Sequence, residues 1–305
     1  MDNLQKAHPF LKWAGGKRKL MPQIDAYLPA ALKNGRLQRY IEPFVGSGAL
    51  FFYIAQTYPL KEYFINDVNS ELIMAYKTIQ SEVESLIDCL TAIESSYLPL
   101  DETARKAFYY KTRAQFNQLG AELDLASFQP QWVTRTAQLI FLNRTCYNGL
   151  FRVNSKGGFN VPFGRYKNPT ICHADNLRVV ARVLQGVWIE NGRYETFSQH
   201  VNDQTFVYFD PPYRPLSQTA NFTAYTNNTF GDVEQLKLAD FYHQLNSVGA
   251  KLMLSNSDPQ NIDPADTFFE GAYANFRIER IQASRRINSR ANKRGIVNEL
   301  LIMNY

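Results

Sequence analysis

The sequence predicts an α/β protein with its site at the carboxyl ends of sheet strands, and three observations lead to this fold class. Residues 207–209 are apolar and stop at Asp-Pro-Pro (210–212), as a buried strand would, because neither proline can donate to a sheet ladder. A strand-like run, a glycine turn and a helix-like run occupy residues 40–55. A further strand candidate, residues 63–65, precedes Asp67. In open α/β sheets, ligands bind at such strand ends.

Asp210 begins a motif suited to an amino nitrogen. Pro211 and Pro212 carry carbonyls on a stiff backbone, and the Tyr213 that follows offers a flat aromatic face. Such acceptors suit a planar ring with an exocyclic NH2 group, because they hold its N–H groups while the ring stacks. Hydrogen bonds to Asp210 and a proline carbonyl would free the lone pair of an amine such as N6 of adenine. The ordinary pKa of an Asp carboxyl is about 3.9. We therefore expect Asp210 to accept a hydrogen bond from the amine first, and to take a proton from the nitrogen after methylation. The alternative is a strand that simply ends in a proline turn.

Composition sets limits on the class of protein. The 305 residues are 45% hydrophobic and 14% aromatic, which is typical of a globular chain. A net charge of +5 is compatible with a nucleic-acid partner. Cys89, Cys146 and Cys172 form no Cys-x-x-Cys pair, so neither disulfides nor a metal is expected. No segment approaches 18 apolar residues and the amino terminus is polar, so we expect a cytoplasmic protein without a membrane partner.

Two glycine-rich stretches are candidates for binding a cofactor. Gly15-Gly16 lies between Trp13 and Lys17 and permits close approach to a charged small molecule; a plain glycine turn before the amphipathic residues 19–28 is the alternative. The turn at residues 46–48 is Gly-Ser-Gly, without the third glycine of the dinucleotide fingerprint.

Asp67 lies about 20 residues beyond the second glycine turn, where an acidic residue can accept hydrogen bonds from ribose hydroxyls. It can equally begin a helix, as can Asn69 or Ser70.

Helical periodicity covers residues 71–116 with an interruption at 98–100, and it returns at 131–142. Cations in these helices are expected either to add to a basic surface or to lie on a solvated helix face; they are Lys111, Arg113 and Arg135.

Residues 143–169 predict a hairpin. Asn148-Gly149 and Gly157-Gly158 are turn signals, and residues 150–154 and 159–163 would form the arms. Cations and aromatics alternate in this stretch: Arg144, Arg152, Lys156, Arg165 and Lys167 with Tyr147, Phe151, Phe159, Phe163 and Tyr166. This mixture favours contacts with phosphates and bases; a surface hairpin with its arginine stems packed on apolar groups is the alternative.

The remaining chain predicts helices at 178–184 and 233–245 and strands at 187–190, 250–254 and 299–305. Residues 214–230 would form a flap that orders on binding. The basic stretch 284–294 would touch phosphate or remain a solvated loop.

Five stretches together closely resemble the Dam family of DNA adenine-N6 methyltransferases (D12 class, α group), in the family's order and over nearly the whole chain. They are residues 10–17, 42–48, 66–67, 147–167 and 210–213. The resemblance implies a Rossmann-like methyltransferase fold that uses S-adenosylmethionine and carries an inserted helical and β-hairpin DNA-recognition domain. It divides the chain into a first catalytic part (1–70), the recognition domain (71–170) and a second catalytic part (171–305).

The resemblance also implies residue roles. The cofactor site would be lined by Trp13, Ala14, Gly15, Lys17, Glu42, Phe44, Gly46, Ser47, Gly48, Asp67 and Asp210. A flipped adenine would be held by Asp210, Pro211, Pro212 and Tyr213. Double-stranded DNA, with GATC as the target, would be contacted by Lys12, Tyr147, Asn148, Leu150, Arg152, Pro162, Arg165 and Lys167. Tyr147 would be the wedge and Leu150, Arg152 and Pro162 the base readers. A separately encoded restriction endonuclease is a candidate companion.

The chain departs from the family mainly in residues 97–131 and 284–294, which leaves the flanking-sequence preference open. Three alternatives remain. A related enzyme would methylate RNA bases or protein glutamine, against which the stretch 147–167 argues. A DNA-binding module with a dead site conflicts with the intact Asp210 motif. A nicotinamide oxidoreductase conflicts with the missing third glycine.

Overall fold

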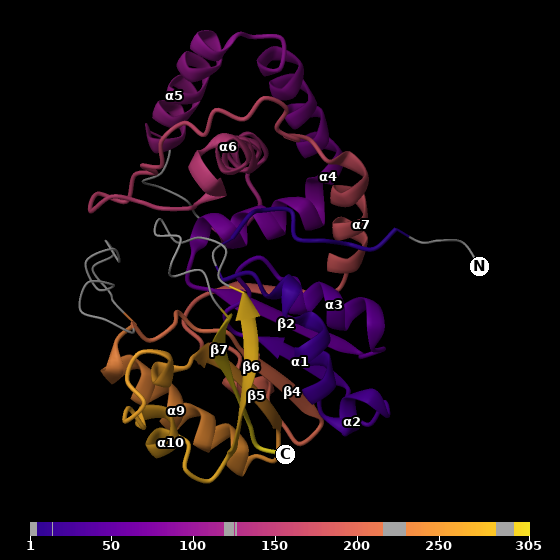
Figure 1. The fold of residues 1–305 in the computed structure, drawn as a ribbon. Helices are drawn as coiled ribbons and strands as arrows, with labels where there is room; N and C mark the ends of the chain where they lie inside the picture. Colours follow the sequence, from indigo (N-terminus) through magenta and orange to yellow (C-terminus); the bar gives the residue numbers. More distant parts are fainter. Residues whose placement is uncertain (1–4, 14, 119–124, 126, 216–229, 285–295) are drawn as a thin grey trace. The chain divides into compact units, whose positions relative to one another are not determined.

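The computed structural model describes residues 5–13, 15–118, 125, 127–215, 230–284 and 296–305 (Figure 1). The chain forms two compact units. Unit 1 consists of Met1–Gly16, Gly46–Thr57 and Asp67–Gly192, and unit 2 consists of Lys17–Val45, Tyr58–Asn66 and Arg193–Tyr305. Ala14, most of the expected flap (216–229) and most of the expected basic loop (285–294) lie outside the described residues.

A seven-stranded sheet runs in the order β3-β2-β1-β4-β5-β7-β6. Its strands are β1 (Arg39–Glu42), β2 (Glu62–Asp67), β3 (Trp188–Asn191), β4 (Thr205–Phe209), β5 (Lys251–Ser257), β6 (Arg277–Ser284) and β7 (Ile296–Met303). β1 is parallel to both β2 and β4, and β4 is parallel to β5, whereas β7 is antiparallel to β5 and β6. The α/β prediction is confirmed. The strand order reverses between β1 and β4, where open sheets bind ligands.

The central strands follow the apolar pattern of the sequence, but one edge strand does not. Every residue of β4 is buried, and the strand ends just before Asp210 and the two prolines, as predicted. β6 was missed. Its cations, Arg277 and Arg280, alternate with Ile278 and Ile281, and an edge strand tolerates such charge because one side of it remains unpaired.

Unit 2 has its core between the sheet and two helices, α9 (Asp232–Ser247) and α10 (Phe268–Ala272), which lie on one face of β4, β5 and β7 (Figure 1). Buried side chains of α9 such as Leu238 and Tyr242 pack on Val207 and Leu252 of the strands. The shorter elements of unit 2 are η1 (Lys17–Lys19), α1 (Met21–Tyr27), α2 (Ala30–Lys33), η3 (Ser198–His200) and η4 (Pro259–Asn261).

Unit 1 is mainly helical, and α6 (Gln131–Thr145) lies between α4 (Ser70–Tyr97) and α5 (Glu102–Gln118) and contacts both (Figure 1). The unit also contains α3 (Ala49–Thr57), η2 (Tyr147–Gly149) and α7 (Ala174–Leu184). Asn69 caps α4, because its side chain accepts from the Leu72 N–H. The helices and the break between α4 and α5 confirm the predicted periodicity.

Arg135 lies neither on a basic surface nor on a solvated helix face, so both expectations for it are wrong. Its side chain is 3% exposed and forms an ion pair with Glu71. The guanidinium also donates to the Phe116 carbonyl at 2.8 Å and stacks on that ring. Arg135 therefore joins α4, α5 and α6 from inside unit 1.

The predicted hairpin arms do not form a regular ladder. Only isolated bridges join Val153 to Phe159 and Cys146 to Phe163 in the described residues. On the edge that faces away from Val153, a side chain binds the backbone: Asn117 accepts from the Phe159 N–H at 2.8 Å and donates to its carbonyl at 3.0 Å. Within the second arm, Pro162 has no N–H to donate to a ladder.

In the part of the chain that the structure describes, no helix is long and apolar enough to cross a membrane. The same residues contain no cluster of three or more His, Cys, Asp or Glu that would hold a metal ion.

Gly48 lies immediately before α3 at φ +69°, and a Cβ there would lie 2.5 Å from the Tyr76 hydroxyl. That hydroxyl donates to the Gly46 carbonyl at 3.1 Å. Gly48→Ala should lower the free energy of unfolding by about 2 kcal/mol, roughly half from the positive φ and half from the displaced hydrogen bond. Urea unfolding followed by circular dichroism measures this loss.

Gly35→Ala is the matched control, because Gly35 has φ +67° but its Cβ would meet nothing within 4 Å. Only the conformational cost of about 1 kcal/mol should appear. An equal loss in both variants would show that Tyr76 does not contribute.

Candidate active site

Asp210 is paired with a buried lysine. It follows β4 directly, and its Oδ1 lies 2.8 Å from the Nζ of Lys17, with side chains 21% and 5% exposed respectively. Burial raises the pKa of the Asp210 carboxyl, while the neighbouring Lys17 ammonium opposes the rise and the Glu299 carboxylate adds to it. The carboxylate thus has a cationic partner and still reaches solvent.

Tyr213 is held by the same cluster. Its hydroxyl donates to Oε2 of Glu299 at 2.7 Å, and the Lys17 Nζ lies 4.6 Å from the centre of its ring. Glu299 belongs to β7 and also lies 3.9 Å from Lys17. Glu299 was not among the predicted site residues; its only signal in the sequence is an isolated carboxylate inside an apolar closing strand. Lys17 therefore orients both Asp210 and Tyr213.

The proline carbonyls have different surroundings. The Pro212 carbonyl accepts from Nε2 of Gln235 at 2.9 Å, and Gln235 accepts in turn from Asn256 at 3.1 Å. Oδ1 of Asn256 accepts from the Arg214 N–H at 3.0 Å. Because Pro212 already has a donor, the carbonyl of Pro211 is the better candidate acceptor for a substrate amine.

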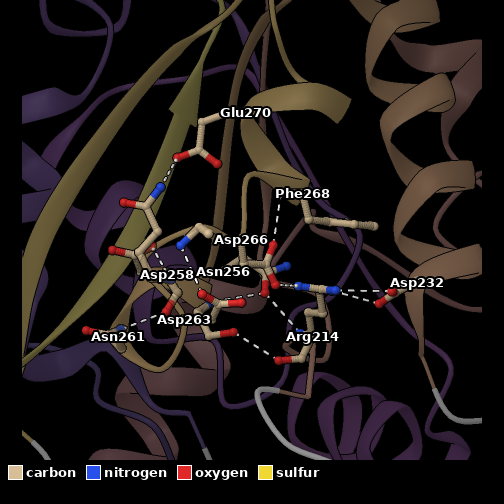
Figure 2. Close-up of polar contacts among 12 residues, drawn as sticks. Arg214, Asp232, Asn256, Asp258, Asn261, Asp263, Asp266, Phe268 and Glu270 are labelled. Atoms are coloured by element: carbon tan, nitrogen blue, oxygen red, sulfur yellow. Dashed lines mark hydrogen bonds and ion pairs between the residues drawn. The ribbon is translucent and has the colours of Figure 1, made fainter.

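Arg214 anchors the chain just after Tyr213, and Figure 2 shows its side chain between two carboxylates. The guanidinium contacts both oxygens of Asp232, at 2.7 and 3.1 Å, and Oδ2 of Asp266 at 2.6 Å. Its Cζ lies 4.2 Å from the centre of the Phe268 ring. Bidentate pairs of this kind fix geometry as well as charge, so the loop that carries Tyr213 is held at its far end.

Glu42 and Phe44 are expected at the cofactor site; Glu42 is the last residue of β1 and Phe44 follows that strand, at the reversal of strand order. Glu42 is buried and accepts from the Tyr40 hydroxyl at 2.6 Å. The Phe44 ring lies 5.6 Å from that of Tyr194 and 5.9 Å from that of Phe230. Both residues, like Lys17 and Asp210, belong to unit 2.

The glycine turn of unit 1 is tied to Asp67. Oδ2 of Asp67 accepts from the Gly46 N–H at 3.0 Å, and Oδ1 accepts from the Asn69 N–H at 2.9 Å. Burial raises the pKa of Asp67, and these backbone donors oppose the rise. A carboxylate has about four acceptor positions, so a hydroxyl can still bind.

The other predicted cofactor residues of unit 1 lie close to this turn or on the amino-terminal loop. The Trp13 indole would be 3.2 Å from a Cβ on Gly46, and it stacks on Phe151 with centroids 5.4 Å apart. Ser47 and Gly48 complete the turn, and Gly15 has φ +77°.

Tyr147 and Leu150 form an exposed apolar pair at η2. They are 56% and 37% exposed, and Asn148 between them has φ +57°. The Tyr147 N–H donates to the carbonyl of the exposed Pro162 at 2.8 Å. A projecting aromatic on a braced turn is suited to inserting between bases.

The predicted DNA-contacting cations differ in how neighbouring side chains hold them. Arg152 is exposed and oriented by Asn160, whose Oδ1 accepts from its Nε at 2.7 Å. Arg165, at φ +52°, lies 3.6 Å from Glu102 with both side chains exposed, and Lys167 is exposed. The Lys12 Nζ lies 4.6 Å from the centre of the Tyr166 ring.

Two members of the alternating pattern face inward. Arg144 donates to the Phe10 carbonyl at 2.7 Å, and Phe159 is 1% exposed. Both residues therefore help to hold unit 1 together.

The structure thus combines an α/β fold with a carboxylate and a tyrosine ring held together at the end of β4. The sequence pattern of the D12 class N6 adenine-specific DNA methyltransferases matches residues 13–287, and the chain belongs to this family. It is an adenine-specific DNA methyltransferase.

Relatives resemble the chain over almost its whole length. It is 49% identical to the type II methyltransferase M.MjaIII of Methanocaldococcus jannaschii, over 97% of this chain and 99% of the relative. It is 37% identical to the type II methyltransferase M1.LlaDCHI of Lactococcus lactis subsp. cremoris, over 100% and 99%. It is 33% identical to the DNA adenine methylase of Escherichia coli (strain K12), over 98% and 96%.

The charges around Asp210 predict opposite effects of two substitutions. Lys17→Met removes the cation that favours the ionised carboxyl, so the pKa of Asp210 should rise further and the acidic limb of the pH profile should move to higher pH. Glu299→Gln removes an anion that raises this pKa, so the limb should move to lower pH. The measurement is kcat/KM for DNA methylation against pH.

Lys19→Met is the control, because it removes an exposed cation of η1 and should leave the limb in place. If Lys17→Met and Glu299→Gln moved the limb in the same direction, Asp210 would not be the titrating group.

Proposed function

We propose that the protein transfers a methyl group from S-adenosylmethionine to N6 of an adenine flipped out of double-stranded DNA, within GATC. The Asp210–Lys17 pair beside Pro211 and Tyr213 carries the proposal. An aromatic face and acceptors next to one another suit the amino edge of adenine. The target atom of a base inside a duplex is out of reach, so flipping is expected.

The donor groups present fit S-adenosylmethionine. Glu42 offers a buried carboxylate for an ammonium, Asp67 offers a partly buried one for ribose hydroxyls, and Asp67 supports a turn of small residues. The remaining proposed cofactor residues are Trp13, Gly15, Lys17, Phe44, Gly46, Ser47, Gly48 and Asp210. When bound, S-adenosylmethionine supplies the electrophilic methyl group.

In the proposed reaction, Asp210 and the Pro211 carbonyl accept hydrogen bonds from the two N–H groups of the adenine amine. These bonds draw the nitrogen toward a tetrahedral geometry and expose its lone pair. Tyr213 stacks on the base. After methylation the nitrogen is acidic, and Asp210 takes its proton. Lys17 holds the carboxylate in place beforehand.

On the DNA side, we propose that Tyr147 enters the stack and that Lys12, Leu150, Arg152 and Pro162 contact bases. Asn148, Arg165 and Lys167 would contact the backbone. The exposed positions of Tyr147, Leu150 and Arg152 support this assignment. The recognition domain would comprise residues 71–170, and GATC rests on the resemblance of residues 147–167.

A separately encoded restriction endonuclease is proposed as a companion, since two relatives are named type II methyltransferases.

The test is transfer of labelled methyl groups from S-adenosylmethionine to duplexes that carry GATC or a one-base variant. Label on adenine N6 in GATC alone is expected, and Asp210→Ala should bind cofactor and DNA but lose roughly 100-fold or more in rate. Asp203→Ala, an exposed carboxylate before β4, is the control. Label at other sites would remove the GATC assignment, and full activity of Asp210→Ala would remove the mechanism.

Arg152→Ala should weaken discrimination at one base pair by about 1–3 kcal/mol, because a guanidinium can bind a base edge with two hydrogen bonds. The measurement compares kcat/KM on GATC with that on each one-base variant. Lys156→Ala, an exposed cation at the hairpin tip, should affect all duplexes alike. Unchanged discrimination in Arg152→Ala would exclude it as a reader.

A further inference from the structure

The amino-terminal segment of unit 1 is held by side-chain amides rather than by a neighbouring strand. Gln56 accepts from the Ala7 N–H at 2.6 Å and donates to its carbonyl at 3.2 Å. Asn176 binds His8 in the same way at 2.9 and 3.0 Å. Asn143 accepts from the Lys12 N–H at 2.8 Å and donates to its carbonyl at 2.9 Å. Each amide therefore acts on the segment as a peptide group of a partner strand would.

Asn143 differs from the other two amides because it also binds the turn that carries the wedge. Its Nδ2 donates to the Gly149 carbonyl at 3.0 Å as well as to Lys12. Asn143 is 1% exposed and belongs to the last turn of α6. One buried amide thus joins the loop of Lys12 to η2.

The turn and Lys12 also touch directly. Gly149 has φ +62°, and a Cβ there would lie 2.3 Å from Cδ of Lys12 and 2.8 Å from its Cβ. Only glycine allows this approach without a shift. On the same side chain, the Nζ lies against the Tyr166 ring. Lys12 is therefore fixed in relation to η2 through both its backbone and its side chain.

We propose that Asn143 is a positioning residue for base discrimination. It touches no base itself, but it fixes the position of Lys12 relative to the Tyr147–Gly149 turn. The inference rests on the proposed function, in which Lys12 and Leu150 contact bases. Base readout depends on hydrogen bonds with narrow limits of distance and angle. Loss of the Asn143 amide lets the two readers shift relative to one another, so wrong bases are rejected less well.

Asn143→Ala tests the proposal, with Asn176→Ala as the matched control that removes the same pair of backbone hydrogen bonds from His8. Both variants should melt at a lower temperature than the parent protein. The ratio of kcat/KM on GATC to that on the best one-base variant should fall about tenfold in Asn143→Ala and less than twofold in Asn176→Ala. An equal change of the ratio in both variants, or none in Asn143→Ala, would overturn the proposal.

Gly149→Ala perturbs the same contact from the turn side and keeps the test decisive if Asn143→Ala does not fold. It should also lower the ratio, and an unchanged ratio would count against the proposal. Lys12→Ala separates the proposal from the function on which it rests. If Lys12→Ala alone leaves the ratio unchanged, Lys12 is not a reader, while a fall in Asn143→Ala would still assign the positioning role through η2.

Discussion

The contact between the buried Lys17 and Asp210 is the interaction on which the candidate active site depends. An ion taken out of water costs several kcal/mol unless a partner and hydrogen bonds compensate. Lys17 supplies the opposite charge at 2.8 Å, and the Asp210 side chain remains 21% exposed. The carboxylate can therefore be both charged and available to a substrate. Tyr213 and Glu299 pack around the same ammonium. Lys17 therefore joins the Asp210 carboxylate, the Tyr213 ring and strand β7.

The residues after the motif explain how so short a segment keeps its shape. Gln235 binds the Pro212 carbonyl, Asn256 binds the Arg214 N–H, and the Ser257 hydroxyl donates to the Arg214 carbonyl. Arg214 is then fixed by two carboxylates. Acceptors that are already oriented need no reorganisation when the substrate charge changes, and this is the usual source of electrostatic catalysis. The supporting groups come from α9 and β5, which pack in the core of unit 2, and from Asp266 just before α10.

Much of the fold was predictable because its signals are local. The apolar run before Asp210, the cap at Asn69 and the break near residue 98 act through neighbours in the chain, and the structure has the expected elements there. β6 was missed because an edge strand keeps its charges. Glu299 and Asn143 were missed for another reason. Their partners are distant in sequence, and no pattern along the chain marks which carboxylate or amide will be buried beside them.

The amide contacts of unit 1 tie the position of Lys12 to a packed helix. Lys12 lies on a segment whose backbone is paired with side chains, and a side chain on a helix is placed by the packing of that helix. Asn143 is flanked on α6 by buried residues such as Leu139 and Leu142. Through the hydrogen bonds of this amide, the packed helix fixes the backbone of both Lys12 and Gly149. The position of a proposed base-contacting residue held in this way is fixed by the core, because the core is close-packed and resists small displacements. In the proposed function, base discrimination would then depend on interior residues such as Asn143 as well as on those that face the DNA.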